Sequence, residues 1–149
     1  MMKHAIDTFF SSPAYAVVGV SRNRRKFGNI IYRSMKERSF QVYPVNPGID
    51  SVEGKKSFPS VIDLPDGVES VVTVVHPEAT ELVVMDCVRK GIKAIWMQLG
   101  SESSEAIKIA NDYDIALVHG KCIIMFLEPV KSFHAVHRAI TRLVGTYPR

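Results

Sequence analysis

The sequence predicts an α/β protein: a Rossmann-like, doubly wound parallel sheet of about five strands with helices on both faces. Short apolar runs rich in β-branched and aromatic residues alternate with stretches in which apolar residues recur at helical spacing. Most of the short runs lack a polar–apolar alternation, which is typical of strands that are covered on both faces. Strands and helices that alternate in series form parallel sheets with right-handed crossovers.

The expected strands are the five short runs, and each is too short for a helix of ordinary length. Trp96 lies inside the fourth run and is expected in the core. The runs lie at residues 15–20 (YAVVGV), 40–45 (FQVYPV), 70–75 (SVVTVV), 94–98 (AIWMQ) and 115–118 (IALV).

The expected helices are recognised by apolar stripes and by the residues at their ends. Ile30, Ile31 and Met35 lie near one face of the second helix, and Gly91 stops the third. Acidic residues favour the start of the fourth helix, and an apolar stripe marks the last one. The helices are expected at residues 2–10, 28–38, 79–90, 102–112 and about 131–144.

Length and composition set bounds on the organisation and the function. The 149 residues fit one domain, 1–149, with a core over 13–120 followed by the C-terminal helix. The 19 basic and 15 acidic residues give a charge of +4, too little to argue for nucleic acid. No apolar stretch nears the length of a membrane span. Two cysteines, Cys87 and Cys122, make no disulfide framework, so a cytoplasmic location is expected.

The loop after the first strand has the features of an anion site. Gly19 lets the backbone turn tightly and lets a ligand approach, and Ser21 offers a hydroxyl. The helix that starts near Gly28 directs its unpaired N–H groups at the loop. Four of residues 22–26 are basic. A solvated basic loop remains the alternative interpretation of this run.

A dinucleotide fingerprint, G-x-G-x-x-G, is incomplete here. Its three positions hold Gly19, Ser21 and Arg24, so two glycines are missing. The usual acid that binds the ribose hydroxyls is also absent from the end of the second strand, residues 43–47. This argues against NAD without excluding NADP. An NAD(P)-binding Rossmann protein, as a redox sensor or an oxidoreductase fragment, stays the alternative function.

Four motifs, each at the carboxyl end of an expected strand, carry a resemblance to a known family. They read VVGVSRNRRKFGN, VYPVNP, VVTVVHP and AIWMQLG. With them the chain resembles the CoA-binding domain family, small single-domain proteins similar to the N-terminal CoA-binding domain of the succinyl-CoA synthetase alpha subunit. The resemblance covers roughly residues 13–120, and the chain departs from the family pattern at Val20 and Arg24.

The resemblance implies that coenzyme A, free or acylated, lies across the strand ends. The pyrophosphate is expected over the loop after the first strand, and the adenosine beside Asn46 and Pro47. The residues implied in binding are Gly19, Val20, Ser21, Arg22, Asn23, Lys26, Phe27, Gly28, Asn29, Asn46, Pro47, Val75, His76, Pro77, Gln98, Leu99 and Gly100.

The sequence favours a ligand-binding module over an enzyme. It shows no paired carboxylates placed for acid–base chemistry, no catalytic triad and no metal-ligand spacing, although the question of a reaction stays open. The expected partner is a small nucleotide-like ligand. No nucleic acid is expected, because the basic run lacks an aromatic platform or a helix-turn-helix, and no membrane, because no apolar stretch is long enough to span one. A homodimer is left open.

Overall fold

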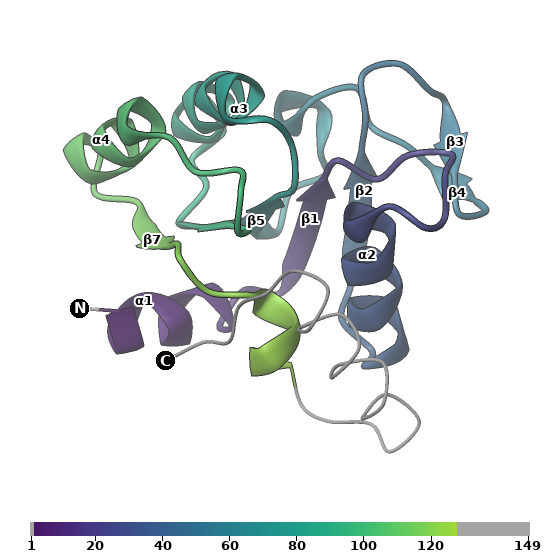
Figure 1. Ribbon diagram of the computed structural model, residues 1–149, viewed down its shortest axis with the longest axis horizontal. Helices are drawn as coiled ribbons and strands as arrows, with labels where there is room; N and C mark the ends of the chain where they lie inside the picture. The colour runs from purple at the N-terminus through teal and green to yellow at the C-terminus, as the bar shows by residue number, and fades with distance from the viewer. Residues whose placement is uncertain (1, 128–149) are drawn as a thin grey trace.

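The computed structural model describes residues 2–127 and has a five-stranded, all-parallel sheet at its centre (Figure 1). The fold class expected from the sequence is therefore confirmed. In spatial order the strands are β2 (Val42–Val45), β1 (Ala14–Val18), β5 (Val68–Thr73), β6 (Ala94–Met97) and β7 (Ala116–Val118).

The strand order has one switch point, between β1 and β5. From β1 the chain moves outward to β2, and it then crosses back to β5 and continues toward β7 on the other side. In open α/β sheets the ligand crevice lies beyond the carboxyl ends of the strands at such a point. The exits of β1 and β5 are therefore the first places to look for a site.

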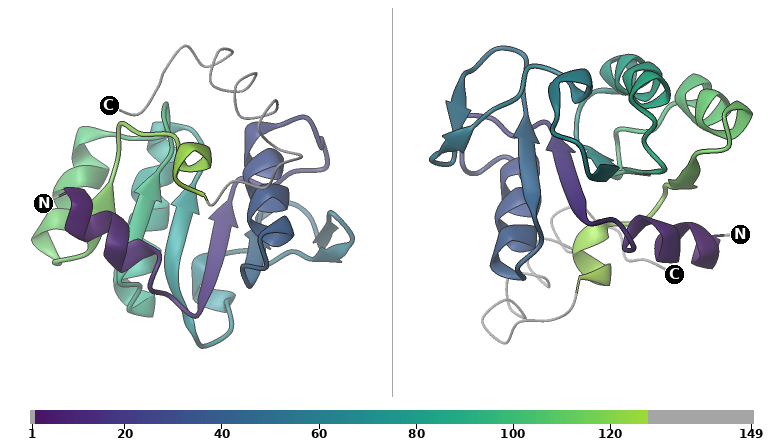
Figure 2. Two further views of the ribbon diagram at one scale, coloured as in Figure 1. Left: turned by 90° about the horizontal axis from the view of Figure 1, so that it is seen from below. Right: turned by 180° about the vertical axis from the view of Figure 1, so that it is seen from behind.

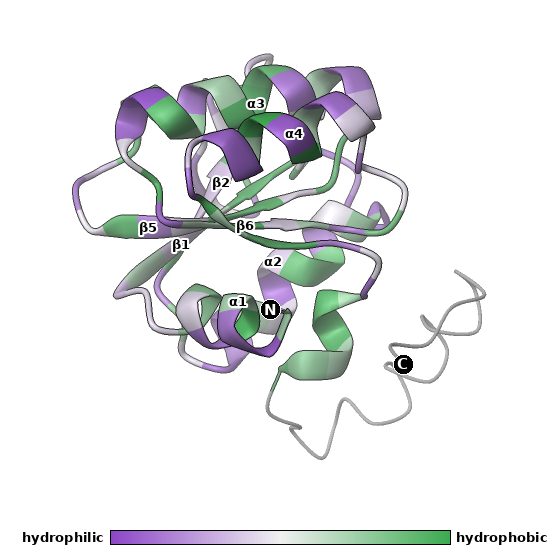
Figure 3. Cartoon of the chain, turned by 90° about the vertical axis from the view of Figure 1, so that its left-hand side faces the viewer, coloured by the Kyte–Doolittle hydropathy of each residue, from purple (hydrophilic) through white to green (hydrophobic). Residues whose placement is uncertain are grey.

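Helices cover both faces of the sheet (Figures 2 and 3). Helices α3 (Pro77–Lys90) and α4 (Ser104–Asp112) form one layer. On the other face lie α1 (Met2–Phe9), α2 (Phe27–Glu37) and the 3-10 helix η2 (Ile123–Phe126). Each face buries its own apolar cluster.

Aromatic rings dominate the core between α1 and the sheet. Phe9 packs against Tyr15 and against Trp96, with ring centroids 5.4 Å apart in both pairs. All three side chains are buried, so the expectation that Trp96 lies in the core is confirmed. The short leading helix is held to the sheet by these contacts.

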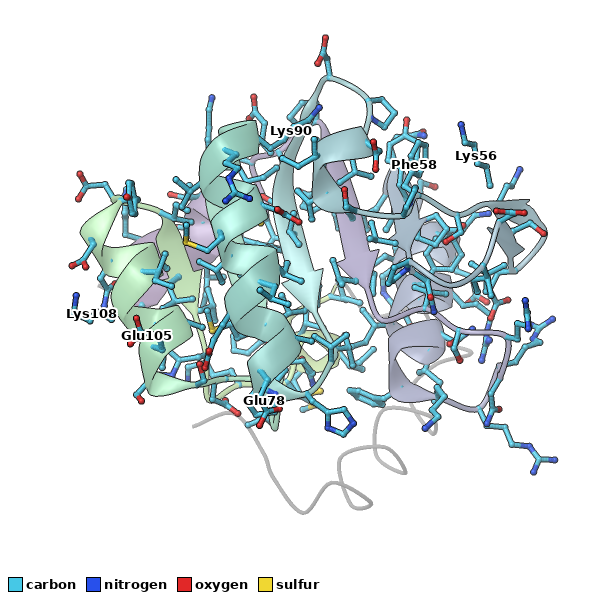
Figure 4. The ribbon with its side chains drawn as sticks, turned by 90° about the horizontal axis from the view of Figure 1, so that it is seen from above. Lys56, Phe58, Glu78, Lys90, Glu105 and Lys108 are labelled. Atoms are coloured by element: carbon cyan, nitrogen blue, oxygen red, sulfur yellow. The ribbon has the colours of Figure 1, made fainter. Side chains whose placement is uncertain are left out.

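Helix α3 shows end residues that suit the helix dipole. Glu78 lies in its first turn and Lys90 in its last, at opposite ends of the helix (Figure 4). The Nζ of Lys90 also donates to the carbonyl oxygen of Leu64 at 2.7 Å, which ties the helix end to the segment before β5. Proline at the first helical position, Pro77, starts α3 two residues earlier than the sequence pattern indicated.

Several element boundaries differ from the expected ones in a way that matters for the site. Strand β1 ends at Val18 rather than at residue 20, and β5 ends at Thr73 rather than at residue 75. Gly19 and Val75 therefore lie in loops, at the edge where a ligand would bind. The C-terminal helix expected over about 131–144 lies outside the described residues.

Beside the sheet lies a β-hairpin, which the sequence did not indicate. Strands β3 (Ser51–Val52) and β4 (Lys55–Lys56) pair antiparallel, and a short 3-10 helix, η1 (Val61–Asp63), follows them. Glu53 and Gly54 at the turn have φ of 54° and 74°, the left-handed geometry of a type I′ turn. Strands of two residues are too short to show a periodic pattern.

Helix α2 packs unusually close to the end of β1. A Cβ added at Gly28 would lie 2.3 Å from the carbonyl oxygen of Gly19. Any side chain at this position would push the first turn of α2 away from the strand. Gly28 therefore sets the distance between the helix and the loop before it.

No helix within residues 2–127 is both long enough and apolar enough to cross a bilayer.

Replacing Gly28 by alanine should destabilise the fold by about 1–3 kcal/mol, the usual cost of overpacking. Gly48→Ala is the matched control, because a Cβ there meets nothing nearer than the Oδ1 of Asn46 at 3.6 Å. The control should stay within about 0.5 kcal/mol of wild type. Equal free energies of unfolding for the two variants, measured by urea denaturation, would show that α2 has room to move.

Hydrogen exchange should be slowest in the central strands β1, β5 and β6, because they are paired on both sides and covered on both faces. The hairpin amides at residues 51–56 should exchange much faster. Amides of residues 94–97 that exchanged as quickly as the hairpin would contradict the central position of β6.

Candidate functional site

Gly19 leaves β1 with φ of +117°, a conformation that side chains rarely adopt. A Cβ at this position would lie 2.3 Å from the carbonyl oxygen of Val74. The sequence predicted a tight turn at Gly19 and room there for a ligand to approach, and the turn is observed. In the structure its first role is to let two neighbouring strand exits, those of β1 and β5, approach each other.

The missing glycine of the dinucleotide fingerprint has a replacement further along the chain. In that fingerprint the third glycine allows close packing of helix on strand. Arg24 holds the expected position, but the loop here is longer and Gly28 makes the close contact with Gly19 instead. Two of the three glycine roles, the turn and the close packing, are therefore filled.

Asn29 fixes the loop to α2. Its Oδ1 accepts from the backbone N–H of Ser21 at 2.9 Å, and its Nδ2 donates to the carbonyl oxygen of Ser21 at 2.7 Å. The residue is fully buried. The same Nδ2 donates to Glu53 at 2.9 Å, so both amide hydrogens have partners. Asn29 thus shapes the loop rather than presenting a free amide to it.

Asn46 makes a similar link between the exits of β2 and β1. Its Nδ2 donates to the carbonyl oxygen of Val20 at 3.0 Å, and its Oδ1 accepts from the N–H of Gly48 at 2.9 Å. The loops that follow two adjacent strands are in this way held in one arrangement.

A carboxylate that the sequence did not single out lies against this loop. The side chain of Glu53 is only 4% exposed, and its Oε2 accepts from Arg33 at 2.6 Å. The Nε of Arg24 is 3.7 Å from its Oε1. Burial alone would raise the pKa of Glu53, but the hydrogen bonds from Asn29 and Arg33 and the charges of Arg33 and Arg24 outweigh it. The pKa is lowered, so Glu53 is ionised at neutral pH.

Two helix N-termini beside the switch point have no side-chain cap. Helix α2 begins after Lys26 and α3 after His76, and neither residue caps its helix. Helix α4, in contrast, is capped by the Oγ of Ser103, which accepts from Ala106 at 3.0 Å. Within residues 2–127 the N–H groups of residues 27–29 have no protein acceptor. Unpaired N–H groups and the positive end of the dipole favour an anion at this place.

The structure gathers the residues expected to bind at one edge of the sheet, because each follows the carboxyl end of β1, β2, β5 or β6. Their exposure differs. Val20 and Gln98 are buried, and the Oε1 of Gln98 accepts from Ile123 at 3.1 Å, so its side chain supports η2. Gly19, Ser21, Phe27, Asn46, Val75, Pro77 and Leu99 are half-buried, whereas Arg22, Asn23, Lys26, Pro47, His76 and Gly100 are exposed.

A cavity of about 370 Å³, open to solvent, lies between the basic loop and the hairpin. Ser21, Arg22 and Arg24 line it on the loop side, and residues 51–54 line it on the hairpin side. Sequence reasoning missed the hairpin side altogether. Only one feature of the sequence could have indicated the hairpin. Asn29 and Arg33 are four residues apart, so they lie on one face of α2 and can donate to a common acceptor.

Neither cysteine is placed for nucleophilic chemistry. Cys87 and Cys122 have no exposed surface. Burial raises the pKa of both thiols, which disfavours the reactive thiolate. In the described part of the chain no three His, Cys, Asp or Glu side chains are grouped to hold a metal ion.

Comparisons with known proteins agree with this architecture. The family model for a CoA binding domain matches residues 13–128. A conserved hypothetical protein from Pyrococcus furiosus superposes with a TM-score of 0.73 at 37% identity, over 76% of this chain and 98% of that one.

Two curated relatives of this chain are much longer proteins. The alpha subunit of ADP-forming acetate–CoA ligase II from Pyrococcus furiosus is 28% identical over 79% of this chain and 28% of its own. ADP-forming acetate–CoA ligase II from Archaeoglobus fulgidus is 34% identical over 76% of this chain and 18% of its own. This chain thus spans less than a third of the length of either ligase. The match of one family model over most of the sequence shows that the chain belongs to the CoA-binding domain family.

Proposed function

We propose that this protein binds coenzyme A, free or acylated, at the carboxyl ends of β1, β2, β5 and β6. The observation that carries the proposal is the uncapped N-terminus of α2, which the close contact of Gly28 with Gly19 holds against the exit of β1. Such a site suits a phosphate group. Family membership then favours CoA among phosphate-bearing ligands.

In the proposed complex the pyrophosphate lies over Gly19 to Ser21 and accepts from the first turn of α2. The adenosine lies beside Asn46 and Pro47. The pantetheine chain passes residues 75–77 and reaches Leu99 and Gly100. Gly100 has no side chain, so a ligand can come close to its backbone. The thiol end, free or acylated, extends beyond this point.

The proposal assigns the countercharge to Arg22 and Lys26. Both are exposed, and neither makes an ion pair within residues 2–127. Arg24 is less available because Glu53 lies 3.7 Å from it. Glu53 also offers little to the ribose hydroxyls of NAD, since its side chain is only 4% exposed and its Oε2 already accepts from Asn29 and Arg33.

We assign a binding role to the chain and no reaction. The acetate–CoA ligases that it resembles carry out their chemistry with much longer chains. A single domain over 1–149 that presents CoA, or holds it, is the simplest organisation for this length.

Removing Arg22 or Lys26 should weaken CoA binding about tenfold to a hundredfold, because a charge-assisted hydrogen bond to phosphate contributes roughly 1.5–3 kcal/mol. Calorimetric titration of Arg22→Ala and Lys26→Ala with CoA and with dephospho-CoA measures this. A side chain that holds the 3′-phosphate weakens CoA selectively, and one that holds the pyrophosphate weakens both ligands alike.

The controls for this titration are Arg89→Ala and Lys93→Ala, which remove the same charges at the opposite edge of the sheet. Both controls should bind CoA like the wild type. If Arg22→Ala and Lys26→Ala also bound both ligands like the wild type, the basic run would be a solvated loop.

Native mass spectrometry of the freshly purified protein should show a fraction with the added mass of CoA or of an acyl-CoA. A protein without a bound species should acquire CoA on titration and gain thermal stability, about 2.7 kcal/mol at 100 times the dissociation constant. When CoA, NAD and NADP are offered together, binding of NAD or NADP in preference to CoA would overturn the proposed ligand.

A further inference from the structure

Glu53 is an acid in an unusual place. It occupies the turn of an exposed hairpin with φ of 54°, a conformation that costs a residue other than glycine, asparagine or aspartate some free energy. Its side chain is nevertheless 4% exposed. Strained positions of this kind persist when the surrounding contacts determine them, and they are concentrated at functional sites.

The contacts of Glu53 reach residues 21–26, which we call the phosphate loop, through the side chains of Asn29 and Arg33. Its Oε2 accepts from Asn29 and from Arg33, at 2.9 Å and 2.6 Å. Asn29 in turn holds both backbone groups of Ser21. Arg33 donates through its other nitrogen to the carbonyl oxygen of Arg24 at 2.9 Å. One carboxylate oxygen therefore orients both side chains that hold the loop, Asn29 at Ser21 and Arg33 at Arg24.

We infer that Glu53 is a positioning residue for the phosphate loop: its carboxylate holds Asn29 and Arg33 in the geometry that lets residues 21–26 bind the pyrophosphate of CoA. The inference rests on the proposed function. It also assigns a purpose to the hairpin β3–β4, which carries Glu53 to the loop from a part of the sequence far from α2.

The electrostatic effect of Glu53 on CoA affinity is opposite in direction to its positioning effect. The direction in which the affinity changes when Glu53 is removed therefore distinguishes the two. A carboxylate close to a phosphate site repels the ligand. If this repulsion were all that Glu53 contributed, its neutralisation would tighten CoA binding. If Glu53 positions the loop, its loss weakens binding although the site becomes more positive.

The experiment measures CoA and dephospho-CoA affinities of Glu53→Ala and Glu53→Gln by calorimetry. Glu53→Ala should bind both ligands at least about tenfold more weakly and by the same factor, since both contain the pyrophosphate. Glu53→Gln keeps the shape and one acceptor oxygen, so its affinity should fall between those of the alanine variant and the wild type. Glu69→Ala, which removes the partner of Lys93 at the far edge of the sheet, should bind like the wild type.

Coupling to Asn29 separates positioning from a general loss of stability. In an Asn29→Ala background the further change Glu53→Ala should cost less affinity than it does in the wild type, because the part of its effect that passes through Asn29 is already lost and only the part through Arg33 remains. Affinity losses that multiply, or a Glu53→Gln variant that binds CoA more tightly than the wild type, would overturn the inference.

Hydrogen exchange of the ligand-free protein distinguishes failure of this inference from failure of the proposed function. The Ser21 amide should exchange faster in Glu53→Ala than in the wild type, with the amides of β5 and β6 unchanged. Unchanged Ser21 exchange would overturn the positioning role whatever the ligand is. A wild type that binds no CoA would overturn the proposed function, and the Ser21 result would still decide the role of Glu53.

Discussion

The close approach of α2 to the exit of β1 is the contact on which the rest of the site depends. It is possible only because Gly28 has no Cβ, since that atom would lie 2.3 Å from the carbonyl oxygen of Gly19. The approach places the N–H groups of residues 27–29, which have no acceptor within residues 2–127, beside the loop that follows β1. Asn29, one residue further, reaches back to Ser21 and fixes the loop in the resulting space.

The sequence predicted the fold class and the edge of the sheet at which to look, because buried parallel strands and amphipathic helices leave strong local patterns. It also predicted that Trp96 is buried. It did not predict that Gly28 replaces a fingerprint glycine, because a loop of altered length changes the spacing without leaving a signal. The hairpin and Glu53 were missed for a related reason: two-residue strands have no period, and the contact of Glu53 with Arg33 is long-range.

The roles of individual site residues were harder to predict than their location. Asn29 and Asn46 were expected to contact the ligand, and the structure shows their amides bonded to the backbones of neighbouring loops. Gln98 lies in the core and supports η2. Side chains of this kind fix the conformation of the loops. The groups left available for a charged ligand are the exposed side chains of Arg22 and Lys26 and the N–H groups of residues 27–29.

The most direct test of the account is a nuclear magnetic resonance titration of the ¹⁵N-labelled protein with CoA. The largest shifts should fall on the amides of residues 19–29, with further shifts at Asn46, His76 and Gly100. The amides of Lys93 and Asp114, which precede β6 and β7 at the opposite edge, should not move. Shifts concentrated at that opposite edge, or no shifts at saturating CoA, would contradict the claim that the N-terminus of α2 and the loop before it bind the phosphates of CoA.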